Sequence, residues 1–269
     1  MPDAALYEAF KAHLLALGVA LPRMLAIFAL LPIFARGIMP GLLRASIAGA
    51  LVLPAAMHLV PETAGVLKAD QLDAPRLVGL VLKEGIIGMM VGYLLAIPFW
   101  AMEGVGFLID NQRGASIAAT INPLTGHDTS PLGILLNQAF IVFFFATGGF
   151  SLFLDVVYGS YSVFPVFAAL PAFDAGAPAA ALQMLDGMVR MALLMAAPVM
   201  IAMFLAEVGL AFVSRFAPQL QVFFLAMPIK SALAMLMLAI YASTLFDYAL
   251  DRVRGMREAV PQAAGLFVR

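Results

Sequence analysis

The chain has 269 residues, of which 64% are hydrophobic and only 12% are charged, and its mean hydropathy is +1.01. A soluble domain has about 45–50% apolar and about 25% charged residues, so much of this surface must face something other than water. The 15 basic and 16 acidic residues leave a net charge of −1 and no basic surface for DNA or RNA. Composition therefore excludes an ordinary cytosolic enzyme, a disordered protein and a nucleic-acid binder, and indicates an integral membrane protein or a subunit of a membrane assembly.

Six apolar segments approach the length of about 20 residues that a membrane-spanning helix needs. A few charged residues interrupt them, and weaker apolar material lies at residues 156–173. The sequence predicts helices at residues 12–35, 45–61, 77–102, 129–154, 191–206 with 208–214, and 216–246.

Prolines lie inside or at the edges of these segments, and a proline removes a backbone donor and kinks or ends a helix. The prolines concerned are Pro22, Pro32, Pro98, Pro198 and Pro228. We expect an all-α integral membrane protein of bent, proline-broken helical hairpins. Residues 1–252 are expected to form a single helical domain, and residues 253–269 a basic tail.

Polar residues gather between the apolar segments, at residues 62–76, 110–131 and 174–187, and again at 247–269. The last of these stretches is the most basic, and positive flanks tend to remain cytoplasmic, so the C-terminus is predicted to lie inside the cell. Residues 1–13 lack the basic region of a cleaved signal peptide, so this segment is expected to be retained.

Several charged residues lie within or at the rim of apolar segments, where each costs about 2.5–3.5 kcal/mol at the centre of a bilayer. They are Arg23, Glu103, Asp155, Arg190, Glu207, Arg215 and Lys230. Either they line a polar pathway or pair with a partner chain, or most of them lie at helix ends and extend to the interface. Lys230 follows Pro228, and is predicted to cap a helix break and to pair with a carboxylate or with carbonyls; its alternative is extension to a lipid headgroup.

Residues with catalytic or metal-binding chemistry are sparse. The chain has no cysteine, and its three histidines are scattered without a metal-ligand neighbour at helical spacing. Gly104 and Gly106 form a lone Gly-x-Gly that is more typical of helix packing than of a nucleotide loop. No catalytic, cofactor-binding or metal-binding residue is predicted, and the protein is not expected to be an enzyme.

The most informative stretch is the polar segment at residues 110–131. Turn signals occur at Asn122-Pro123, Thr125-Gly126 and Ser130-Pro131. A polar loop of this length is usually functional or disordered, and Ile117 and Ile121 supply apolar anchors that argue against disorder. It can fold back among the helices and occupy a channel axis, or it can be an ordinary surface loop.

Four parts of the sequence resemble the SctT/FliR family, the export-gate subunit of bacterial type III secretion systems. They are GFLIDNQRGAS at residues 106–116, NPLTGHDTSPLGILLNQ at 122–138, the Gly148-Gly149 turn, and APQLQVFFLAMPIK at 217–230. Gln221 stands where this family usually has Asn. The resemblance covers roughly residues 15–252, and the DNQRGAS form is more similar to the injectisome branch than to the flagellar branch.

The resemblance implies a structural channel subunit in the bacterial inner membrane, multi-pass by sequence. One copy would join several R and S subunits in a closed helical assembly, the entrance of the export channel, with much of it above the membrane plane. A U-type switch protein and a V-type export protein would lie nearby. Secreted proteins would be the transported substrates, with membrane lipid also in contact.

The resemblance also implies roles for individual residues. The polar loop would act as part of the channel plug. From the residue types we further expect Ile117 and Ile121 to fill the axis and Gly114 and Gly126 to allow tight turns. Its residues are Asp110, Asn111, Gln112, Arg113, Gly114, Ser116, Ile117, Ile121, Asn122, Pro123, Gly126, Ser130 and Pro131. Contacts with other subunits are expected at Glu103, Glu207, Arg215, Pro218, Gln219, Pro228 and Lys230.

Two other classes of function remain open at this stage. A secondary transporter or small-molecule permease would also be rich in apolar helices, although no strong internal repeat relates two halves of the chain. An intramembrane enzyme would need a nucleophile or a metal pair, for which the sequence offers no candidate.

Overall fold

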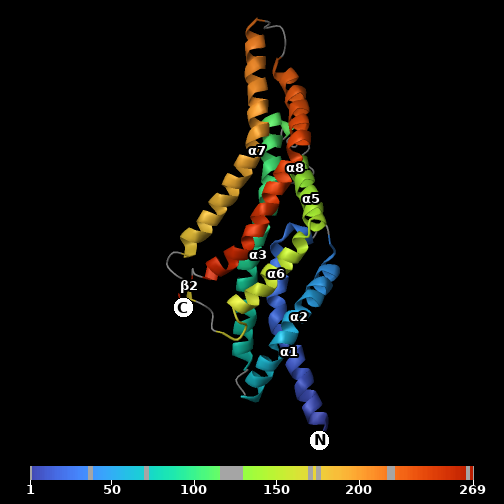
Figure 1. The fold of residues 1–269 in the computed structure, drawn as a ribbon, viewed down its shortest axis with the longest axis vertical. Helices are drawn as coiled ribbons and strands as arrows, with labels where there is room; N and C mark the ends of the chain where they lie inside the picture. The colour runs from blue at the N-terminus through green and yellow to red at the C-terminus, as the bar shows by residue number, and fades with distance from the viewer. Residues whose placement is uncertain are drawn as a thin grey trace. The chain divides into compact units, whose positions relative to one another are not determined.

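The structure is a computed structural model of the chain. It describes residues 2–35, 39–69, 73–115, 130–168, 172–173, 177–216, 222–264 and 267–268. These residues are almost entirely helical, as the sequence predicts (Figure 1).

The helices follow one another along the whole described chain. They are α1 (Pro2–Leu30), the short 3-10 helix η1 (Pro32–Phe34), α2 (Gly41–Lys68), α3 (Ala74–Arg113), α5 (Pro131–Ala146), α6 (Gly149–Val163), α7 (Ala177–Phe216) and α8 (Val222–Ala264). Two short strands, β1 (Ala172–Phe173) and β2 (Phe267–Val268), pair antiparallel, with Ala172 opposite Val268.

The membrane-spanning character of the chain is confirmed. Among the described residues, 5 helices are long and apolar enough to cross a membrane, or up to 6 spans if the broken pair α5–α6 counts as one. Each of the six predicted segments falls on one of these elements. The protein is therefore a multi-pass membrane protein.

Several helices are longer than the sequence predicts, because they continue past the charged and polar residues that bound the apolar segments. Helix α2 continues to Lys68, α7 begins at Ala177, and α8 continues to Ala264 through most of the predicted tail. Ala, Arg and Glu are strong helix formers, so a polar surface alone does not end a helix.

Proline does not end a helix at four of the five positions named above. Helices run without interruption through Pro22, Pro98, Pro198 and Pro228, and only Pro32 lies at a helix end. A membrane helix tolerates proline where neighbouring groups satisfy the freed carbonyl. The break between α5 and α6 lies instead at Gly148, whose φ of 78° favours glycine.

The described chain divides into two compact units. One contains residues 1–96, 150–180 and 255–269, and the other contains residues 97–149 and 181–254. Helix α3 contributes its first part to one unit and its last part to the other.

The core of the first unit is packed from α1, α3 and α6. Phe28 stacks on Phe34 with ring centroids 3.7 Å apart, and Phe153 of α6 lies 6.4 Å from Phe28. Gly88 and Gly92 of α3 lie directly against the backbone of α1, where a Cβ on Gly92 would be 2.9 Å from the Ile27 Cα atom. These two glycines, one helical turn apart, let α1 and α3 approach closely.

The core of the second unit is aromatic. Phe99 of α3 lies 5.1 Å from Phe140 and 5.3 Å from Phe144, both on α5. Phe246 of α8 lies 5.5 Å from Phe143 on the same helix. These ring contacts join α3, α5 and α8 by the offset and edge-on geometries that aromatic pairs prefer.

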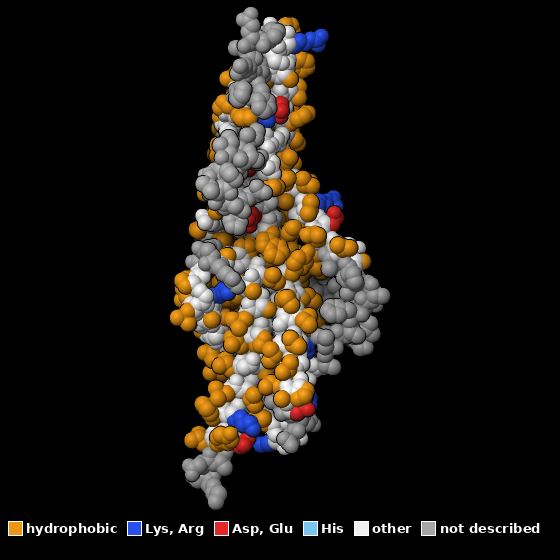
Figure 2. Space-filling model, turned by 180° about the vertical axis from the view of Figure 1, so that it is seen from behind, with side chains coloured by type: hydrophobic (Ala, Val, Ile, Leu, Met, Phe, Trp, Pro, Cys, Tyr) orange, Lys and Arg blue, Asp and Glu red, His pale blue; other side chains and the backbone are white. Residues whose placement is uncertain are grey.

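Large apolar side chains remain exposed on the outside of both units. Ile240 is 70% exposed, Val142 69% and Leu205 62%. Figure 2 shows apolar side chains covering much of the face in view. Exposed apolar area of this extent marks contact with lipid or with other protein chains.

Replacing Gly88 by Ala is expected to destabilise the first unit by about 1–3 kcal/mol, as overpacking does. The new Cβ would collide with the Arg23 backbone and would lie 2.8 Å from the Ala26 Cβ atom. The matched control is Gly85→Ala on the same helix, where a Cβ would meet nothing within 4 Å. The thermal unfolding midpoint of both variants in detergent is the measurement; equal midpoints would contradict the close α1–α3 contact.

Candidate functional site

The two ends of the predicted plug loop are joined by one carboxylate. Asp110, at the end of α3, is buried, and its Oδ2 atom accepts hydrogen bonds from the Ser130 hydroxyl at 2.6 Å and from the Leu132 backbone N–H at 3.0 Å. Its Oδ1 atom accepts from Arg113 at 2.7 Å. Ser130 is also the N-cap of α5, accepting from the Gly133 N–H at 2.9 Å. Asp110 therefore caps the start of α5 from another helix, where a negative charge is favoured.

Close packing of two glycines fixes the same region. Gly106 of α3 lies against the backbone of Gly133 and Leu132, and a Cβ on Gly133 would lie 2.8 Å from the Glu103 carbonyl oxygen. Neither position has room for a side chain. The end of α3 and the start of α5 are therefore held together by packing as well as by Asp110.

The other described residues of the predicted loop lie at the end of α3, except Pro131, which is the first residue of α5. Gln112 donates a hydrogen bond to the Met200 carbonyl of α7 at 3.0 Å, whereas Asn111 is exposed. Gly114 has a φ of 83°, which glycine adopts readily, so the chain turns there as predicted. The remaining predicted loop residues lie outside the described residues: Ser116, Ile117, Ile121, Asn122, Pro123 and Gly126.

Lys230 forms an ion pair within the chain. Its Nζ atom lies 3.1 Å from Glu207 Oε2, which joins α8 to α7, and the Glu207 side chain is 53% exposed. Since α8 runs through Pro228, no helix break lies at Lys230, and that part of the prediction is wrong.

The remaining predicted subunit contacts differ in their surroundings. Glu103 is exposed and accepts a hydrogen bond from the Asn137 side chain at 3.3 Å, and Arg215 is exposed in the last turn of α7. Pro218 and Gln219 lie outside the described residues.

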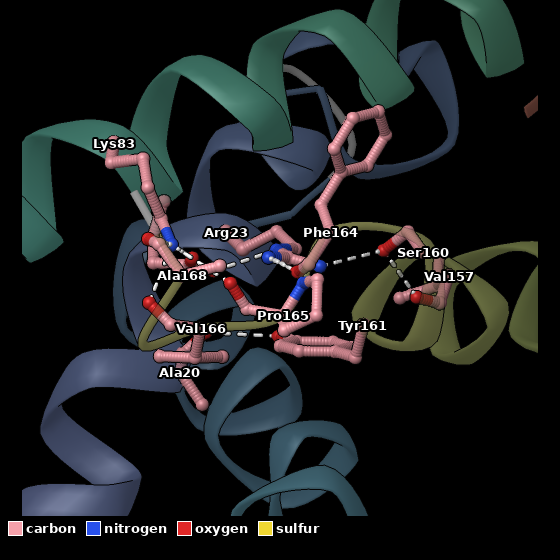
Figure 3. Close-up of polar contacts among 11 residues, drawn as sticks. Ala20, Arg23, Lys83, Val157, Ser160, Tyr161, Phe164, Pro165, Val166 and Ala168 are labelled. Carbon is pink, nitrogen blue, oxygen red and sulfur yellow. Dashed lines mark hydrogen bonds and ion pairs between the residues drawn. The ribbon is translucent and has the colours of Figure 1, made fainter. Parts of the chain in front are cut away.

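A second polar cluster, centred on Arg23, lies inside the first unit (Figure 3). Arg23 of α1 is fully buried and donates from Nε to Glu84 of α3 at 2.7 Å. Its two other nitrogens donate to the Ser160 hydroxyl at 3.2 Å and to the Phe164 carbonyl at 2.7 Å. Its guanidinium carbon also lies 4.1 Å from the centre of the Tyr161 ring. Arg23 thus ties α1 to α3 and to the end of α6.

Lys83 completes this cluster. Its Nζ atom donates to the carbonyls of Pro165 at 2.9 Å and Ala168 at 3.0 Å, and also to that of Val166. An ammonium group has three N–H donors, and these three carbonyls use all of them. Glu84 Oε1 lies 3.3 Å from the Lys83 Nζ atom, so the two groups form an ion pair in which Oε1 accepts no hydrogen bond. Two cations therefore hold the turn at residues 164–168, where the negative end of the α6 dipole favours them.

The sequence pattern marks Arg23 as a costly charge, whereas Lys83 and Glu84, which interrupt the apolar segment 77–102, are not among the residues that it marks. The sequence does contain a signal for these two residues, because two adjacent opposite charges inside an apolar helix need charged or polar partners. What the sequence does not contain is the identity of those partners, since the cluster joins residues that are 61 and 141 positions apart.

The described residues contain no group of three or more His, Asp or Glu side chains that could hold a metal ion. The contacts found at these clusters instead position helices and close a loop.

Replacing Arg23 by Met is expected to destabilise the fold by about 3–5 kcal/mol, because it leaves the buried Glu84 without its guanidinium partner. The double variant Arg23→Met with Glu84→Gln removes the unpaired charge and should recover part of the loss. Arg190→Met, at an exposed arginine, serves as the control. Yield of folded protein and the unfolding midpoint are measured, and a double variant no better than the single one would argue against the ion pair.

Replacing Lys230 by Met is expected to lower the yield of any assembled complex several-fold, because Glu207 would keep its charge in an apolar part of α7 without its partner. Removing both charges, by Lys230→Met with Glu207→Gln, should restore the yield. Complex yield after purification is the measurement. A single variant that assembles and secretes as well as the wild type would show that the pair is dispensable.

Comparison with known proteins places the chain among bacterial secretion proteins. The family model described as "Bacterial export proteins, family 1" matches residues 14–256. The chain is 41% identical over 236 residues to Yop proteins translocation protein T of Yersinia pestis, covering 88% of this chain and 89% of that protein.

Two further relatives show how far the similarity extends. The surface presentation of antigens protein SpaR of Salmonella typhimurium is 34% identical over 242 residues, covering 89% of this chain and 87% of SpaR. The flagellar biosynthetic protein FliR of Bacillus subtilis is 32% identical over 168 residues, covering 62% of this chain and 65% of FliR. Yop proteins translocation protein T and SpaR thus match over more of the chain than this flagellar relative does, in agreement with the DNQRGAS form. The chain belongs to the bacterial export protein family 1, the SctT/FliR family.

Proposed function

We propose that this protein is the T-type subunit of a type III secretion export gate and acts as a structural, non-enzymatic part of the channel. The observation that carries this function is the family match over residues 14–256, which spans both described clusters. Its relatives are named as translocation, secretion-apparatus and flagellar biosynthetic proteins. The permease alternative has no comparable support.

The proposal extends to the partners and the membrane. R- and S-type subunits would cover part of the exposed apolar surface, with U- and V-type proteins nearby, and the assembly would lie in the bacterial inner membrane. Exposed side chains such as Ile240, Val142 and Leu205 support this, because a chain with so much uncovered apolar area needs protein or lipid neighbours. Secreted proteins would pass through the assembled channel.

Within that assembly, the segment between Arg113 and Ser130 is proposed to seal the channel. The support comes from its base: Asp110 holds the end of α3 to the start of α5, and Gly106 packs directly on Gly133. A segment with both ends fixed to the same rigid support has restricted reach, which suits a plug better than a flexible linker.

Deleting residues 115–119 is expected to leave a leak for ions and small solutes, because a shortened plug cannot fill the axis. Asp110→Ala should produce a weaker leak, since it frees the base of the loop without shortening it. The control is Asp186→Asn, at an exposed carboxylate on α7.

The measurement is small-solute permeability of cells in which co-purification with R- and S-type subunits has been verified. A deletion variant that assembles and remains as tight as the wild type would place the seal elsewhere in the complex. A wild-type chain that does not co-purify with those subunits would contradict the export-gate function itself.

A further inference from the structure

A cavity of about 510 Å³ opens between α2 and the end of α6, within the first unit. One face of α2 lines it with Pro54, His58 and Glu62, and α6 contributes Tyr158 and Tyr161. The Tyr158 hydroxyl donates to the Leu51 carbonyl at 2.8 Å and the Tyr161 hydroxyl to the Ala20 carbonyl at 3.0 Å. The hydroxyl groups are therefore occupied, and the two tyrosines offer the cavity mainly their rings.

Glu62 is the formally charged residue of the cavity lining, and no cation of the described chain is in direct contact with it, although Lys83 interacts with it at longer range. Glu62 is exposed, none of the described lining residues is Lys or Arg, and no ion pair of Glu62 is found among the described residues.

The donors of Arg23 and Lys83 are bonded to groups other than Glu62, although Lys83 still interacts with Glu62 through space. Both side chains approach the end of α6 from the interior and take the carbonyls of residues 164–168. Arg23 lies over the ring of Tyr161. The outer side of the same helix end is left with the carboxylate of Glu62 and the aromatic rings.

The position of Glu62 in the chain adds a constraint. It lies in α2, one of the helices apolar enough to span a membrane. It lies near the C-terminal end of that helix, at the start of the polar stretch 62–76, where a carboxylate faces water or pairs with a charged group. His58 lies one turn before it on the same face, which is consistent with a polar contact there rather than lipid.

We propose that this cavity binds a basic side chain, a Lys ammonium or an Arg guanidinium, presented by a partner subunit. The charged end would pair with Glu62, and the apolar stem would lie along Pro54 and the tyrosine rings. A lipid amine fits less well, because its phosphate lies beside the ammonium and would meet Glu62 with no cation in the lining. This inference rests on the proposed export-gate function in one respect only, namely that the basic side chain comes from another subunit of that assembly.

The chemistry of the cavity can be tested on the full chain alone. Because the chain has no cysteine, Ser162→Cys places a single thiol in the cavity lining. Its rates of reaction with a trimethylammonium-bearing and a sulfonate-bearing thiosulfonate reagent are compared in non-ionic detergent. Ser151→Cys, exposed on the same helix but outside the lining, corrects for the general charge of the particle.

The cationic reagent should be preferred by roughly threefold to fivefold at residue 162 relative to residue 151, as a partly exposed charge pair allows. Glu62→Gln should abolish this preference, whereas Glu8→Gln, at an exposed carboxylate of α1, should leave it unchanged. Equal rates for both reagents, or a preference that survives Glu62→Gln, would overturn the proposal.

The source of the cation is tested in the complex with R- and S-type subunits. A neutral thiosulfonate should react at least tenfold more slowly with Ser162→Cys in the complex than in the isolated chain, and Glu62→Gln should restore the rate. If the slow reaction persists in the Glu62→Gln complex, a partner side chain is not the occupant of the cavity. The same conclusion follows if the isolated chain shows the slow reaction when phosphatidylethanolamine is added. Since the reagent preference needs no partner, it separates failure of this inference from failure of the export-gate function.

Discussion

The buried ion pair between Arg23 and Glu84 is the interaction around which the first unit is organised. A fully buried guanidinium needs a partner for its charge and acceptors for its N–H groups. For Arg23, Glu84 of α3 supplies the opposite charge, and the Ser160 hydroxyl and the Phe164 carbonyl accept further hydrogen bonds. Replacing such a pair by apolar residues can be neutral, but breaking it leaves one charge uncompensated. The pair therefore contributes less to the net stability of the fold than to its specificity. Both charges find partners only when α1, α3 and α6 pack in this one arrangement.

Close backbone contact makes that arrangement possible. Gly88 and Gly92 let α3 approach α1, and this contact brings residue 84 within reach of Arg23. The second unit repeats the device, with Gly106 against Gly133 and Asp110 as the nearby carboxylate. In both units, glycines let two helices approach closely. This brings a carboxylate of one helix within hydrogen-bonding distance of donors on or beside the other helix.

The buried charged groups of the described chain are paired within it, whereas many apolar side chains on its surface are exposed, and this difference affects how the chain can assemble. The two buried polar clusters find their partners within the chain, so they do not need another subunit to be stable. The exposed side chains are instead largely apolar, which gives area for association but little orientation. Orientation in such an interface has to come from its few exposed charges, and Glu62 and Glu103 are two of them.

The sequence by itself determined the class of the protein, because 64% hydrophobic residues in segments of spanning length permit little else. Its motifs also determined the family, and the costly charges indicated a polar pathway or pairing with a partner chain, or extension to the interface. Only the tertiary structure decided which groups pair: Arg23 with Glu84, Lys230 with Glu207, and Asp110 with Ser130. It also decided that helices continue through Pro22, Pro98, Pro198 and Pro228. Hydrophobicity and turn propensity are local properties of a segment, whereas the partner of a buried charge depends on contacts between helices far apart in the chain.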